Sequence, residues 1–146
     1  MWNTRKSIQL SLALVDLCIL VALVCAFAMP TIAAWHAASF GRAEARQLSI
    51  AFYCCLPFAL LALGALHRLL RNLLKELLFI AQNVTLLRVL SWCCFAVALV
   101  TLVAGCFYQP FLLICAAAAF MGLILRVVKN VFCSAIELKA ENDMTI

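Results

Sequence analysis

The chain has 146 residues, of which 68% are hydrophobic and only 12% charged, with a mean hydropathy of +1.15. Soluble domains average about 45–50% apolar and about 25% charged residues, so a globule of this size could not bury so much apolar surface. The composition therefore excludes a soluble domain and indicates that lipid is the solvent. We interpret the net charge of +5 as a topology signal and an attraction to anionic lipid, and we expect no direct nucleic acid binding.

Four apolar runs are long enough to cross a hydrocarbon core of about 30 Å, which takes about 20 helical residues. Lipid cannot satisfy exposed backbone groups, so each run must be helical. The sequence predicts an all-α fold: one domain over residues 1–146, forming a compact up-down bundle of four transmembrane helices with the fourth span near its centre. The predicted spans cover residues 8–29, 48–66, 89–108 and 111–131.

Lysine and arginine indicate the orientation, because they collect in cytoplasmic segments. They occur at the N-terminus, in the connection 67–88 and beyond the fourth span, whereas two arginines in the loop 30–47 are offset by Glu44. We therefore expect a multi-pass membrane protein with both termini in the cytoplasm.

Asp16 lies within the first predicted span, about eight residues or 12 Å from its inner end. A charge inside the membrane is costly and marks a candidate functional site with a partner. We expect that partner to be Arg126, at a similar depth in the fourth span. Three interpretations remain open: a structural ion pair, a protonated Asp16 hydrogen-bonded within the bundle, or a relay for protons or cations.

The connection between the first two spans, residues 30–47, is predicted to be a loop. Pro30 and Gly41 punctuate it, and both residue types interrupt helices.

The stretch HRLLRNLLKELL (67–78) separates leucines from polar residues around a helical wheel. It predicts a cytoplasmic amphipathic helix over 67–79, followed by a break near Gln82–Asn83. This helix suits either the anionic inner leaflet or a groove on a partner protein. The candidate docking or membrane-surface residues are Arg68, Arg71, Lys75 and Asn83, together with Glu141, Asn142 and Asp143 in the tail.

The fourth span and the tail carry two further signals. Ala118 and Gly122 form a small-residue pair, which predicts close helix contact in lipid. The tail 134–146 becomes polar and acidic. Its first part should extend the fourth helix, whereas the ending ENDMTI should fray or serve as a recognition segment.

Catalytic constellations are missing from the sequence. It has no nucleophile–base pair, carboxylate pair or phosphate-binding glycine loop, so we expect no enzyme, catalytic residue or cofactor. His36 and His67 are separated by a whole span, and the nine cysteines lack metal-ligand spacing. We expect no metal site and interpret the cysteines as packing residues.

Two segments resemble a known family. LLFIAQNVTLLRVLSW (77–92) and LRVVKNVFCSAIELKAENDMTI (125–146) are similar to the YoaS-like family of small four-span bacterial membrane proteins of unknown function. The matching residues are Asn83, Leu87, Glu141, Asn142, Asp143 and Thr145, while Gln82 stands where that family usually has an acidic residue. Its members are often encoded beside an Xre-like helix-turn-helix regulator. The resemblance therefore implies a bacterial cell membrane and a cytoplasmic partner.

Two functional hypotheses follow. The first is a non-enzymatic membrane sensor or regulatory protein that binds a small helix-turn-helix regulator through the 67–88 connection and the 134–146 tail. The alternative is a small ion or solute transporter that uses Asp16 and Arg126, as a homo-oligomer.

Overall fold

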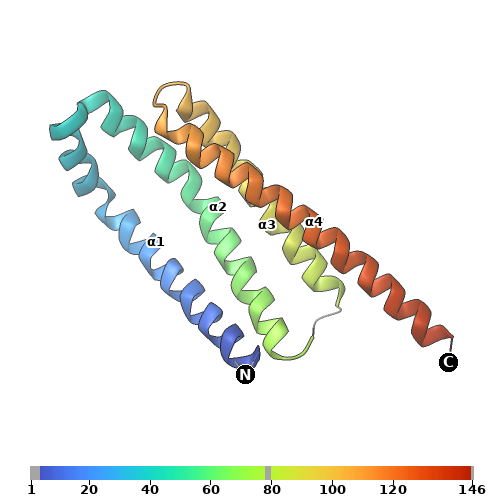
Figure 1. The fold of residues 1–146 in the computed structure, drawn as a ribbon. Coiled ribbons are helices and arrows are strands. Elements are labelled where there is room, and N and C mark those ends of the chain that lie inside the picture. The colour runs from blue at the N-terminus through green and yellow to red at the C-terminus, as the bar shows by residue number, and fades with distance from the viewer. Residues whose placement is uncertain (1–3, 78–79, 146) are drawn as a thin grey trace.

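The computed structural model describes residues 4–77 and 80–145. Within these residues the chain forms four helices and no strand. All four helices are long and apolar enough to cross a membrane, and successive helices run in opposite directions (Figure 1). The predicted all-α, four-helix membrane fold is therefore confirmed. The helices are α1 (Thr4–Phe40), α2 (Arg42–Leu74), α3 (Ala81–Gly105) and α4 (Pro110–Met144).

The bundle has two distinct ends. The termini end holds the start of α1, the α2–α3 connection and the end of α4, whereas the hairpin end holds the α1–α2 and α3–α4 turns (Figure 1). Each helix packs along its neighbours in sequence: α1 on α2, α2 on α3 and α3 on α4. Among the described residues α4 packs on no other helix, so it lies at one edge. The prediction that the fourth span is central was therefore wrong.

Apolar side chains cover the outside of the helices. Phe27 on α1 is 87% exposed and Leu113 on α4 is 79% exposed, and many other large apolar residues share this exposure. Soluble monomers rarely expose such continuous apolar surface, whereas lipid solvates it without cost. The exposure therefore agrees with the multi-pass membrane assignment.

The predicted loop 30–47 is helical almost throughout. α1 continues through Pro30 to Phe40, and Gly41 alone separates α1 from α2. Proline has no N–H to donate to the carbonyl of Ala26, four residues earlier. The hydroxyl of Tyr53 on α2 donates to that carbonyl instead, at 3.0 Å. Gly41 then reverses the chain with φ +119°, a conformation that favours glycine.

The amphipathic stretch is not a separate helix. Residues 67–74 are the last two turns of α2, and α3 begins at Ala81, so Gln82 and Asn83 lie inside a helix rather than at the predicted break. Glu76 adopts φ +60°. The N–H of Leu77 donates to the carbonyl of Asn72, and the N–H of Glu76 donates to that of Leu73. This pattern is a Schellman motif, in which the left-handed position is usually glycine.

α3 and α4 approach each other closely at Gly122. A Cβ atom there would lie 3.2–3.3 Å from atoms of Phe95 and Cys94. The hydroxyl of Ser91 also donates to the carbonyl of Gly122, at 2.9 Å. Small residues permit such backbone contact between helices in lipid, so Gly122 acts as the sequence predicts.

Candidate functional site

A layer of charged side chains crosses the bundle near the termini end. The amide of Asn72 on α2 donates to the side-chain oxygen of Asn83 on α3. His67 on α2 and Arg88 on α3 each lie five residues from this contact. Because the two helices are antiparallel, His67 and Arg88 lie at the same height along the bundle axis. Arg88 and Lys129 line one small cavity between α3 and α4. His67 also meets Asp16 on α1, so all four helices contribute to this layer.

A charge-free layer begins on the hairpin side of these residues. On α2 it covers residues 47–66, and along α3 and the turn that follows it covers residues 89–108. The α2 stretch has about 20 helical residues and spans about 30 Å, the thickness of a hydrocarbon core. On α1 the equivalent stretch follows Asp16. We infer that Asp16 lies at the border of the apolar layer rather than about 12 Å inside it.

Asp16 pairs with His67 instead of Arg126. The Oδ1 atom of Asp16 lies 2.7 Å from Nδ1 of His67. Arg126 lies on α4, with its guanidinium carbon 6.0 Å from the ring centroid of Trp92 on α3. Among the described residues α1 does not pack on α4. The predicted pairing of Asp16 and Arg126 is therefore corrected, because similar depth does not make two helices neighbours.

Three basic side chains surround a small cavity between α3 and α4. The cavity has a volume of about 70 Å³ and is lined by Arg88, Arg126 and Lys129 together with Ser91 and Trp92. No carboxylate lines it. Basic side chains at the edge of an apolar layer attract anionic lipid headgroups. This cluster was not predicted, because the sequence does not reveal that α3 and α4 hold these residues at one level.

The candidate docking residues of the connection fall into two groups. Arg68, Arg71 and Lys75 are exposed on the end of α2, as a docking or membrane-surface role requires. Asn83 is fully buried. Its oxygen accepts from Asn72, and its amide donates to the carbonyl of Leu77 at 2.7 Å. Asn83 therefore fastens the connection to both helices and is not available as a docking surface.

The tail continues α4 as a helix to Met144, so the predicted fraying of residues 141–144 was wrong. Glu141, Asn142 and Asp143 are all exposed. The hydroxyl of Thr145 donates to the carbonyl of Glu141 at 2.7 Å and closes the last turn.

Residues that could hold a metal do not gather in the described parts of the chain. Across residues 4–77 and 80–145, no group of three or more His, Cys, Asp or Glu side chains is placed to bind a metal ion. All nine cysteines are free thiols. His36 lies far from the charged layer, where it stacks on Phe40 and meets the ring of Tyr108.

A family model described as "Protein of unknown function (DUF2975)" matches residues 5–146. This match covers nearly the whole chain, and the chain therefore belongs to this family. No curated protein and no solved structure matches it.

Proposed function

We propose that the protein is a non-enzymatic docking protein of the bacterial inner membrane, which holds a small soluble regulator at its termini end. The observation that carries this proposal is the end of α4. Arg88 on α3 and Lys129 on α4 line the same cavity. Ala81 is as many residues from Arg88 along α3 as Ile136 is from Lys129 along α4. The residues of α4 beyond 136 therefore project past the start of α3, as Figure 1 shows.

The projecting part of α4 has the properties of a recognition helix. All of its residues from 137 to 144 are exposed, including Leu138 at 65% and Met144 at 85%. These two apolar side chains lie outside the charge-free layer, where lipid tails do not cover them. An exposed helical end with apolar anchors suits a groove on a partner protein.

The distribution of charge supports a cytoplasmic termini end. Arg42 and Arg46 stand near the hairpin end, and all the remaining lysines and arginines stand near the termini end. Such an excess marks the cytoplasmic side of a membrane protein. The exposed Arg68, Arg71 and Lys75 at the end of α2 would also hold this end against the anionic inner leaflet.

The chemistry of the projecting helix indicates the partner. Glu137, Glu141 and Asp143 make this end acidic, with Lys139 as its basic residue. A helix-turn-helix protein presents a basic surface to DNA phosphates, and an acidic helix would compete for that surface. The proposed mechanism is therefore sequestration of the helix-turn-helix regulator that the family resemblance implies.

A photo-reactive amino acid in place of Asn142 tests the proposal in intact cells. The expected crosslink product is a small soluble protein with a helix-turn-helix domain. The same amino acid in place of Leu113, which is exposed at the hairpin end, serves as the control and should capture no such protein. Capture of lipid and membrane proteins alone at position 142 would contradict the proposal.

A pair of charge-reversal variants sharpens the test. The double variant Glu141→Lys/Asp143→Lys should lose the crosslink, because it repels a basic partner. The variant Glu44→Lys changes an acidic residue at the opposite end and should keep the crosslink. Green fluorescent protein fused to the C-terminus should fluoresce, because it matures in the cytoplasm.

The transport hypothesis depended on Asp16 and Arg126 acting together inside the membrane. In the part of the chain that the structure describes, the helices that carry these residues do not pack on one another, and Asp16 has His67 as its partner. No arrangement in the described residues favours transport, so we do not propose it.

A further inference from the structure

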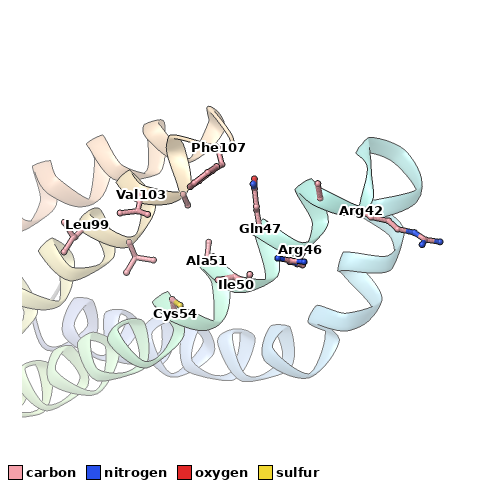
Figure 2. A pocket seen from close by; sticks show the side chains of 12 residues that line it. Arg42, Arg46, Gln47, Ile50, Ala51, Cys54, Leu99, Val103 and Phe107 are labelled. Atoms are coloured by element: carbon pink, nitrogen blue, oxygen red, sulfur yellow. The ribbon is translucent and has the colours of Figure 1, made fainter.

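A large apolar groove runs between α2 and α3 near the hairpin end. Its volume is about 810 Å³, within the range of about 300–1,000 Å³ typical of ligand sites. Ala43, Ala51 and Ala104 line it, and their small side chains leave it hollow. Figure 2 shows Leu99 and Val103 of α3 and Phe107 of the following turn on one side, and the α2 residues on the other.

The groove is open to the surroundings of the bundle. Leu99 is 64% exposed and Phe107 is 71% exposed, and both belong to its wall. The groove residues from Ile50 to Cys54 and from Leu99 to Phe107 lie in the charge-free layer, so the surroundings there are lipid tails. An acyl chain could therefore enter from the side without crossing a polar barrier.

Polar side chains gather at one end of the groove only. Arg42, Arg46 and Gln47 belong to the lining, and they stand at the border of the charge-free layer. Figure 2 shows Gln47 extending toward Phe107 and Arg42 extending past the hairpin end of the groove. None of the three has a hydrogen-bond or ion-pair partner among residues 4–77 and 80–145. Glu44, the nearest acidic residue in sequence, does not line the groove.

We propose that this groove is a binding site for one anionic phospholipid, with an acyl chain against Leu99, Val103 and Ile50 and the phosphate at Arg42 and Arg46. The depth of the apolar part matches the position of lipid tails, and the depth of the arginines matches that of headgroups. Guanidinium groups bind phosphate oxygens through two parallel hydrogen bonds. The two positive charges favour an anionic headgroup over a zwitterionic one.

This site is independent of the proposed docking function, because it lies at the opposite end of the molecule. It also differs from the basic cluster of Arg88, Arg126 and Lys129, which has a cavity of only about 70 Å³. That cavity has no room for an acyl chain.

The test uses the full-length protein in nanodiscs that contain phosphatidylglycerol or phosphatidylcholine with a photo-reactive acyl chain. Crosslinked peptides are mapped by mass spectrometry. Phosphatidylglycerol should label the groove residues Leu99 to Phe107 about tenfold more than phosphatidylcholine, because two arginines attract its charge. Equal labelling by the two lipids would overturn the proposal, and this comparison needs no variant.

Three variants separate the headgroup site from the acyl-chain site. Arg42→Gln/Arg46→Gln should reduce the preference for phosphatidylglycerol to less than about twofold. Arg68→Gln/Arg71→Gln removes the same charge at the termini end and should leave groove labelling unchanged. Ala104→Phe should fill the groove and lower labelling by both lipids.

Two other results would contradict the assignment. One is an equal loss of groove labelling in the Arg68→Gln/Arg71→Gln control, which would make the preference an effect of total charge. The other is protection of the groove by a second copy of the chain, detected as protein–protein crosslinks at Val103 in both lipids.

Discussion

The two hairpins of the molecule are joined by different kinds of contact. α3 and α4 meet through backbone, since Gly122 lies against Phe95 and Cys94 and its carbonyl accepts from the hydroxyl of Ser91. Gly105 continues this close approach toward the turn, where a Cβ atom would lie 2.6 Å from Leu112. Close packing of the two helix backbones therefore contributes most to holding the α3–α4 hairpin together.

α1 and α2 are joined by polar side chains instead. Tyr53 donates to the carbonyl of Ala26, and His67 pairs with Asp16. Gly64, the glycine of α2 inside the charge-free layer, has nothing within 4 Å of a Cβ position. The α1–α2 hairpin therefore combines side-chain packing with two polar contacts and lacks a close approach at a glycine.

The difference teaches how helices associate where burial of apolar surface gives no driving force. Close packing fails when one side chain becomes too large, whereas a polar contact fails when one donor or acceptor is lost. Within the described parts of the chain α1 packs on no helix other than α2, so its contacts with α2 decide whether α1 stays in place.

Gly122→Leu should have the largest effect, because it forces α3 and α4 apart. We expect the free energy of unfolding to fall by about 3 kcal/mol, measured by denaturation in mixed detergent micelles. Gly64→Leu is the matched control, because the space around Gly64 is open, and its effect should stay within about 0.5 kcal/mol. Equal losses of unfolding free energy in the two variants would contradict the view that close packing at Gly122 stabilises the α3–α4 pair.

Asp16→Asn should have the next largest effect, acting on the α1–α2 hairpin. A double-mutant cycle with His67→Gln should give a coupling energy of about 1–2 kcal/mol for the hydrogen bond. The parallel cycle of Asp16→Asn with Arg126→Gln should give a coupling near zero. A clear coupling to Arg126 would restore the pairing expected from the sequence and contradict the structure.

Tyr53→Phe should destabilise the protein by about 1 kcal/mol, because it leaves the carbonyl of Ala26 without a donor in lipid. The decisive test repeats Tyr53→Phe in a protein that also carries Pro30→Ala. Alanine restores the N–H that proline lacks, so the cost of Tyr53→Phe should disappear in the double variant. An unchanged cost would mean that Tyr53 does not compensate for Pro30.

Glu76→Gly should have the smallest effect and the opposite sign. It removes the strain of a left-handed glutamate at the end of α2 and should stabilise the protein by about 0.5–1 kcal/mol. Glu76→Ala is the control, because it removes the pair with Arg5 (3.6 Å, both side chains largely exposed) but keeps the strain. A large loss in Glu76→Ala would make this pair a third α1–α2 contact, although exposed pairs contribute little.

The sequence predicts the four helices well, because long apolar runs have one stable structure in lipid. It does not predict where they end. Pro30 signals a break, but Tyr53 from another helix supplies the missing donor, which a local pattern cannot reveal. α2 ends at Leu74, and the left-handed position that follows it is occupied by Glu76, where glycine is the residue type expected.

The candidate site was predicted in part. Asp16 has a side-chain partner in His67, whereas the expectation of Arg126 assumed that depth alone decides contact. The side-by-side order of the helices decides which residues are in contact, and the hydropathy of the sequence does not predict that order. Asn83 looked like a polar surface residue of a connection, yet its side chain is buried and bonds the side chain of Asn72 and the carbonyl of Leu77.

The restriction of packing to successive helices also bears on how the protein is assembled. Across residues 4–77 and 80–145 every helix–helix contact joins helices that are consecutive in the chain, so each helix can pack on a partner that is close to it in sequence. Such local connectivity favours rapid folding. We expect α1–α2 and α3–α4 to enter the bilayer as two hairpins, each joined by its own contacts before α2 and α3 come together.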